Sequence, residues 1–185
     1  MSRGVCQEIM RTKGLVHIYH GDGKGKTTAA FGLALRALGN GWRVGILQFL
    51  KGSPTGEVTA LEEIKNVTVR RNSKDFGFFS NMSLRDRQEM TAMQNHNLQL
   101  LIEEIKEGKY DMVILDELCA AYNQKSVERN LVKELLELTT GRIELIITGR
   151  NPHDDLLSYA DYVTQMQQER HPFERGLMAR QGIEY

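Results

Sequence analysis

Residues 20–28, which read HGDGKGKTT, decide the fold of this chain. Their three glycines let backbone N–H groups converge on phosphate oxygens, and a helix that begins near Lys26 adds the positive end of its dipole. The Lys26 ammonium can neutralise phosphate charge, and the Thr27 hydroxyl can bind Mg²⁺. The usual pattern, G-x-x-x-x-G-K-S/T, has a leading glycine where this chain has His20. The stretch predicts a nucleotide triphosphate site with one departure at its start.

The residues on either side of this loop predict a strand before it and a helix after it. Residues 15–19 (LVHIY) form a short apolar run typical of a buried strand. Residues 26–38 are rich in alanine and leucine, and the Gly-Asn-Gly that follows is a good helix terminator. The motif therefore lies in a strand–loop–helix unit.

The remaining chain continues the alternation of strands and helices, which predicts an α/β fold with a mostly parallel sheet. Strands are expected at residues 44–49, 67–70, 112–115, 143–148 and 162–166. Helices are expected within residues 51–64, after a capping box at Ser83 and Asp86, from a cap at Ser126 to Gly141, and over residues 151–160. We find no repeat or second domain, so we expect residues 14–185 to form one domain after an extension of residues 1–13.

Composition excludes several classes of protein. Lysine plus arginine equals aspartate plus glutamate at 24 each, so no broad positive field attracts nucleic acid. Cys6 and Cys119 are the only cysteines and form no C-x-x-C motif, as expected of free thiols in the cytosol. No stretch approaches the roughly 20 apolar residues that span a membrane. We expect a cytoplasmic protein with no nucleic-acid or membrane partner.

An acidic pair, Asp116 and Glu117, follows the apolar run at residues 112–115. Parallel α/β sheets bind ligands at the carboxyl ends of their strands, so this pair is expected to face the phosphate loop, and one of the two to bind Mg²⁺ directly or through water. Arg150 follows another predicted strand and is expected to reach the same crevice and contact a phosphate tail.

Several stretches together resemble the ATP:corrinoid adenosyltransferases of the P-loop type. They are residues 20–52, TGE at 55–57, VILDEL at 113–118, ITGR at 147–150 and the ending HPFERGLMARQGIEY. The resemblance implies a RecA-like P-loop fold and a homodimer. It implies transfer of the 5′-deoxyadenosyl group of ATP to cobalt(I) of a reduced corrinoid, with release of triphosphate, in adenosylcobalamin synthesis or salvage. In this family ATP lies reversed in a loop that is short at its start, so His20 is an expected departure.

The resemblance also assigns roles to residues. Cobalt(I) is a strong nucleophile, so the protein has to orient it and stabilise charge on triphosphate, for which Lys24, Lys26, Arg150 and Mg²⁺ are suited. Thr27 and Glu117 are the better candidates for the metal, with Asp116 beside them. The residues expected to bind ATP are His20, Gly21, Asp22, Gly23, Lys24, Gly25, Lys26, Thr27, Thr28, Arg36 and Arg150. Arg36 is otherwise a surface arginine with a packed stem.

The corrinoid is expected at residues 75–82 (DFGFFSNM), which we name the aromatic segment. The family's aromatic side chains here close the lower face of the corrin, and an apolar face excludes water from cobalt. Phe78 and Phe79 are the candidates, whereas Ser80 stands where related sequences often carry tryptophan. The alternative is that these phenylalanines fill the core beneath a loop.

Two other classes of function also fit a phosphate loop with an acidic pair. One is a nucleotide-dependent binding module that makes no cobalt–carbon bond, and the other is a P-loop hydrolase or small-molecule kinase. The departure at His20 and the carboxyl-terminal motif favour transfer. Cobalamin, cobinamide and cob(I)yrinic acid a,c-diamide remain open as the corrinoid, and a flavoprotein is one candidate reductant.

Overall fold

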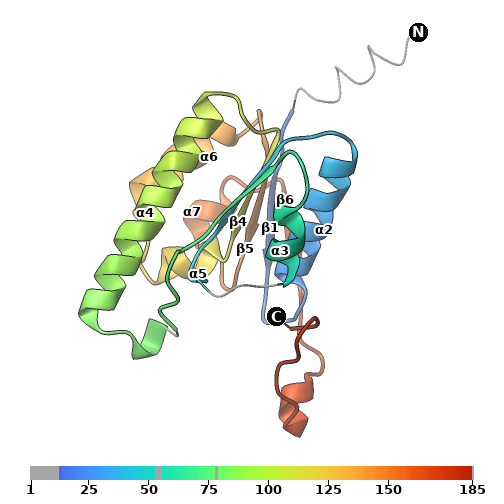
Figure 1. Ribbon diagram of the computed structural model, residues 1–185, viewed down its shortest axis with the longest axis vertical. Helices are drawn as coiled ribbons and strands as arrows, with labels where there is room; N and C mark the ends of the chain where they lie inside the picture. Colours follow the sequence, from blue (N-terminus) through green and yellow to red (C-terminus); the bar gives the residue numbers. More distant parts are fainter. Residues whose placement is uncertain (1–12, 53–55, 78, 185) are drawn as a thin grey trace.

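A six-stranded sheet organises the protein, and all of its strands are parallel (Figure 1). The computed structural model describes residues 13–52, 56–77 and 79–184. The strand order is β3-β2-β4-β5-β1-β6. The strands are β1 (Val16–His20), β2 (Val44–Gln48), β3 (Val67–Arg70), β4 (Met112–Asp116), β5 (Glu144–Thr148) and β6 (Tyr162–Gln165). This is the single α/β domain that the sequence predicted.

Helices cover both faces of the sheet, as parallel connections require. One face carries α2 (Lys26–Gly39) and α3 (Gly56–Glu62). The other carries α4 (Leu84–Lys106), α5 (Leu118–Asn123), α6 (Arg129–Thr139) and α7 (Asp154–Leu157). Two short 3₁₀ helices, η1 (Phe79–Asn81) and η2 (Pro172–Arg175), lie outside these layers. Within the described ranges, no helix is long and apolar enough to cross a membrane.

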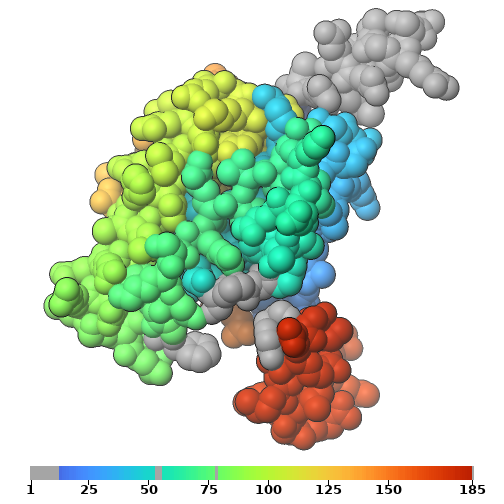
Figure 2. Space-filling view, in the orientation of Figure 1, coloured from blue at the N-terminus to red at the C-terminus, as the bar shows by residue number. Residues whose placement is uncertain are grey.

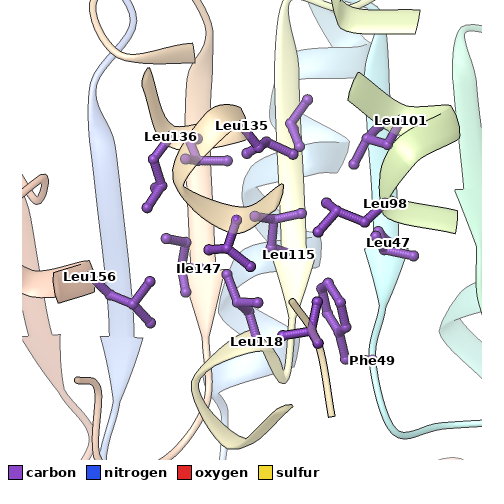
Figure 3. Close-up of a cluster of buried hydrophobic side chains, with 14 of the residues drawn as sticks. Leu47, Phe49, Leu98, Leu101, Leu115, Leu118, Leu135, Leu136, Ile147 and Leu156 are labelled. Atoms are coloured by element: carbon purple, nitrogen blue, oxygen red, sulfur yellow. The ribbon is translucent and has the colours of Figure 1, made fainter. Parts of the chain in front are cut away.

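The larger core lies between the sheet and the four helices α4 to α7 (Figure 3). Alternate residues of the central strands face it, such as Leu115 and Ile147, and meet Leu98 of α4 and Leu135 of α6. Their neighbours Ile114 and Ile146 face the α2 side instead. Because both faces are buried, β2 and β4 consist entirely of buried residues.

The order of the strands decides where a ligand site forms. The strand β5 lies between β1, which leads into the phosphate loop, and β4, which ends at Asp116. Since every strand is parallel, the ends of β1, β2, β4 and β5 all reach one edge of the sheet. Residues that immediately follow these strands are therefore brought together there.

Two predicted helix boundaries are wrong. Ser126 does not cap α6, which begins at Arg129 without a side-chain cap. Ser126 is buried, and its hydroxyl donates to the Ala121 carbonyl oxygen at 3.2 Å, because the unpredicted helix α5 ends just before it. The helix expected over residues 151–160 is shorter and consists of α7 alone. Just before β6, the Asp161 N–H donates to the Val16 carbonyl oxygen and the Asp161 carboxylate accepts from the Val16 N–H, so the chain is already aligned with β1 there.

Candidate functional site

The phosphate loop connects β1 to α2 and packs against the chain that follows β6. The Gly23 N–H donates to the Met166 carbonyl oxygen at 2.8 Å. A Cβ at Gly21 or Gly23 would lie 2.3 or 2.7 Å from that same oxygen, so this close approach requires glycine at both positions. Gly25 has φ of 111° and precedes α2, whose first turn has no side-chain cap. Uncapped N–H groups at a helix start form an anion site.

Lys26, the first residue of α2, is almost buried at the floor of the loop. It is 9% exposed, and its Nζ donates to the Gly23 carbonyl oxygen at 2.7 Å. Burial lowers the pKa of Lys26, while the charge of Glu117 raises it and that of Arg150 lowers it further, so that the net shift is downward. Among the described residues its ammonium forms no ion pair, so a phosphate group could become its direct anionic partner.

Asp116 lies at the end of β4 and is fully buried. Its Oδ1 accepts hydrogen bonds from the hydroxyls of Thr27 and Thr148, each at 2.7 Å. Its Oδ2 accepts from Gln48 Nε2 at 3.0 Å and from Lys51 Nζ at 3.1 Å. A carboxylate has about four acceptor positions, so these four donors saturate it. Asp116, at the end of β4, therefore links the start of α2 to the ends of β5 and β2.

Three of those donors, Thr148, Gln48 and Lys51, were not predicted as site residues. Each ends or follows a strand of the sheet, which is the general position of ligand-binding groups in parallel α/β folds. All three also lie in stretches that carry the family resemblance, Thr148 in ITGR and the other two within residues 20–52, but neither stretch assigns them a role.

Glu117, the next residue, has a different environment. Its backbone is left-handed, with φ of 62°, and its N–H donates to Thr148 Oγ1 at 3.0 Å. Among the described residues the Glu117 carboxylate accepts no hydrogen bond. Glu117 lines a cavity and does not share the hydrogen bonds around Asp116. Burial, and then the charge of Asp116, raises the pKa of Glu117 despite three nearby cations. The acidic pair is thus divided into a saturated carboxylate and an available one.

A cavity of about 500 Å³ opens beside the loop. The loop side contributes Lys24 and Lys26, and Arg150 and Glu117 follow the strands β5 and β4. The carboxyl-terminal residues, red in Figure 2, lie directly beside this edge of the body and close the cavity from the other side. Their contribution is Gln168, His171, Phe173, Glu174 and Glu184. Cations near a helix N-terminus can accommodate a polyphosphate.

Lys24 is engaged by the carboxyl-terminal residues. Its Nζ donates to the Ile183 carbonyl oxygen at 2.9 Å and to Glu184 Oε1 at 3.0 Å. Bonds from Arg180 and Lys24 lower the pKa of Glu184 to about 2, so its carboxylate stays charged. The sequence did not predict Glu184 as part of the site, although the ending of the chain was one of its distinctive motifs.

The remaining predicted ATP residues lie at various distances from the cavity. Asp22 borders it, and its Oδ1 accepts from the Gln168 N–H at 3.3 Å. His20 ends β1 and is half-buried, and Thr28 is exposed in the first turn of α2. Arg36 is exposed in the last turn of α2 and does not line the cavity.

Apart from the buried Met82, the described part of the aromatic segment lies at the surface near the start of α4, and Phe78 falls outside the described residues. The Arg87 guanidinium lies 4.6 Å from the centre of the Phe79 ring, and Lys74 Nζ lies 4.6 Å from that of Phe76. Both rings are half-buried and belong to neither core cluster. The alternative that these phenylalanines fill the core is wrong for Phe76 and Phe79. Ser80 is exposed.

Comparison with known proteins gives a consistent result. A sequence model of the family described as ATP:corrinoid adenosyltransferase BtuR/CobO/CobP matches residues 12–185. Corrinoid adenosyltransferase CobA of Salmonella typhimurium is 37% identical over 181 residues, covering 96% of this chain and 89% of the relative. Corrinoid adenosyltransferase of Escherichia coli K12 is 36% identical over 176 residues, covering 94% and 86%. A corrinoid adenosyltransferase of Sinorhizobium sp is 33% identical over 185 residues, covering 97% and 86%.

The matched region includes the phosphate loop, the acidic pair and the carboxyl-terminal residues that line the cavity. The relatives are matched over most of their own length, so the likeness concerns the whole domain. The chain therefore belongs to the ATP:corrinoid adenosyltransferase BtuR/CobO/CobP family.

Proposed function

We propose that this protein transfers the 5′-deoxyadenosyl group of ATP to cobalt(I) of a reduced corrinoid. The observation that carries the proposal is the family match over residues 12–185. In the reaction the cobalt(I) electron pair attacks the 5′ carbon of ATP, and a cobalt–carbon bond forms. The bond from that carbon to its oxygen breaks, and the electron pair leaves with inorganic triphosphate. No protein base is needed, because no proton is removed from the nucleophile.

The cations at the cavity would stabilise the departing triphosphate. Lys26 is nearly buried and lines the cavity together with Arg150. Lys24 can join them once a phosphate replaces Glu184 as its partner. Charge that develops on a leaving group is stabilised best by groups fixed in place before the reaction.

The donor set also fits Mg²⁺. This ion usually binds one or two carboxylates together with phosphate oxygens and water, and it would supply positive charge to the triphosphate. Thr27 and Glu117 would hold it, since the Glu117 carboxylate faces the cavity. Asp116 would act through Thr27, because the Thr27 hydroxyl donates to Asp116 and so directs its lone pairs elsewhere.

The aromatic segment is the proposed corrinoid-facing surface. Phe79 lies in η1 beside a hollow of about 490 Å³ between the start of α4 and residues 124–128. An aromatic ring can pack against the lower face of a corrin and exclude water from it. A homodimer and a flavoprotein reductant stay predictions for sedimentation and binding experiments.

The test is to incubate the protein with ATP, Mg²⁺ and chemically reduced cobalamin without oxygen and in dim light. We expect a light-sensitive adenosylcorrinoid and inorganic triphosphate in equal amounts. ADP and phosphate without an alkylcobalt product would identify a hydrolase and refute the proposal. Cobinamide and cob(I)yrinic acid a,c-diamide in parallel reactions would rank the corrinoids.

A further inference from the structure

Residues 49–52, which follow β2, contact three separate parts of the molecule, and we name them the connector. The Phe49 N–H donates to the Asp116 carbonyl oxygen at 2.9 Å. The Leu50 N–H donates to Oε1 of the buried Gln94 in α4 at 2.8 Å, and Leu50 itself is left-handed with φ of 60°. A non-glycine residue in this conformation is held there by its surroundings. The connector thus has a fixed path from the end of β2.

Lys51 ties the connector to the nucleotide side of the site. Its Nζ lies 3.1 Å from Asp116 Oδ2, and the two side chains are 32% and 0% exposed. Burial lowers the pKa of Lys51, but the charge of Asp116 and their hydrogen bond, with Glu117 and Glu57, raise it above its usual value. The ion pair reaches Thr27 through the shared Asp116 carboxylate.

Gly52 brings the connector against the start of the aromatic segment. A Cβ at Gly52 would lie 2.2 Å from the Lys74 carbonyl oxygen and 2.6 Å from the Asp75 nitrogen. These are backbone atoms, so a larger residue can fit only if the aromatic segment moves. The same stretch also meets α4: Lys74, just before the segment, donates from Nζ to Glu89 Oε2 at 2.9 Å, and the Arg87 guanidinium lies 4.6 Å from the centre of the Phe79 ring.

We infer that Lys51 is a positioning residue for the transfer reaction: its ion pair with Asp116 holds the connector against the aromatic segment. One element would then fix the spacing between the phosphate loop and the corrinoid-facing surface. This inference rests on the proposed function, because it assigns the two sides to ATP and corrinoid. Spacing matters in an in-line displacement, where a misplacement of about 1 Å can cost on the order of 100-fold in rate.

Four variants test the inference. Lys51→Met removes the ammonium but keeps much of the stem, whereas Lys51→Arg keeps the charge. Gly52→Ala displaces the aromatic segment without touching Asp116. Lys133→Met is the matched control, since Lys133 is an exposed lysine of α6 that pairs with Glu137. The readouts are amide hydrogen exchange over residues 72–82, ATP binding by calorimetry, and steady-state kinetics with ATP and reduced cobalamin varied separately.

We expect Lys51→Met and Gly52→Ala to accelerate exchange over residues 72–82 about tenfold, to lower kcat about tenfold and to raise KM for cobalamin. KM for ATP should change less than threefold in Gly52→Ala. Lys51→Arg should return the exchange rate and the kinetics with cobalamin to wild-type values. Unchanged exchange in Lys51→Met and Gly52→Ala overturns the inference, as does an equal rise of both KM values in Gly52→Ala. Hydrogen exchange requires no turnover, so it tests the connector's role even if the wild-type protein forms no adenosylcorrinoid. That lack of product would refute the proposed function separately.

Discussion

The phosphate loop and the aromatic segment are fixed to the same domain in different ways. The loop is a continuous stretch whose backbone packs on Met166 and whose threonine binds the buried Asp116. The described part of the aromatic segment contacts Arg87 of α4 through Phe79, and at its start Lys74 pairs with Glu89 of α4 and lies against Gly52. One half of the site is therefore preorganised by buried polar bonds, while the position of the other depends on partly exposed side chains and one backbone contact. Substitutions should therefore act differently in the two halves.

The largest effect is expected from Lys26→Ala. Loss of the buried ammonium removes charge from the triphosphate as it leaves, so kcat should fall about 10²–10³-fold. Formation of adenosylcobalamin, followed by its absorbance, measures the change. Lys106→Ala, at an exposed lysine of α4 that pairs with Glu134, serves as the control and should retain wild-type turnover. Turnover within threefold of wild type in Lys26→Ala would remove this lysine from the chemistry.

The two neighbouring carboxylates should respond in opposite directions. Asp116→Asn places an amide NH₂ opposite the donors Gln48 and Lys51, or opposite the two threonines if the amide is flipped. A buried donor then faces other donors, so the free energy of unfolding should fall by about 2–4 kcal/mol. Glu117→Gln should unfold at the same or a higher urea concentration at pH 7, because it removes an ionised group that burial disfavours. Urea denaturation without ATP or Mg²⁺ measures both.

The pH dependence of these unfolding curves provides a second check. The pKa of Glu117 is higher in the folded state than in the unfolded state. At a pH between these two pKa values, the folded state therefore binds more protons at Glu117 than the unfolded state does. Wild-type protein should gain stability relative to Glu117→Gln as the pH falls through that raised pKa. A gap between the two proteins that stays constant down to the ordinary glutamate range would contradict the expected burial of Glu117.

A smaller effect is expected from Phe79→Ala in the aromatic segment. The ring stacks beneath the Arg87 guanidinium at the surface, and its loss should raise KM for cobalamin about three- to tenfold. KM for ATP and the melting temperature should stay near wild type, because Phe79 belongs to neither core. Steady-state kinetics with each substrate varied distinguishes these outcomes, and a loss confined to ATP would reverse the assignment of the two halves.

The smallest effect is expected from Glu184→Gln, where the carboxyl-terminal residues meet the loop. The charged Glu184 competes with phosphate for Lys24, so its neutralisation should tighten ATP binding about two- to threefold. Calorimetric titration with ATP measures this change. Weaker binding would mean that Glu184 supports the nucleotide site.

Sequence reasoning recovered the parts of the molecule that local patterns determine. The strands, the helix after the loop and the capping box at Ser83, whose Oγ accepts from the Asp86 N–H at 3.1 Å, are confirmed. It missed α5, because six residues are too short for a periodic pattern, and consequently misplaced the cap at Ser126. Lys51, Thr148 and Glu184 were missed because their partners lie far away in sequence, so only the folded chain brings them to the site.

The left-handed backbone at Glu117 explains why the order of Asp116 and Glu117 in the sequence matters. Because the chain turns sharply between Asp116 and Glu117, one carboxylate enters the interior and its neighbour meets the cavity. Asp116 is therefore the structural anion and Glu117 is the acid available to a ligand, so neither residue can replace the other. Exchanging them to Glu-Asp would preserve composition and charge, yet it would force a longer side chain into a filled cluster and shorten the reach of the acid outside it.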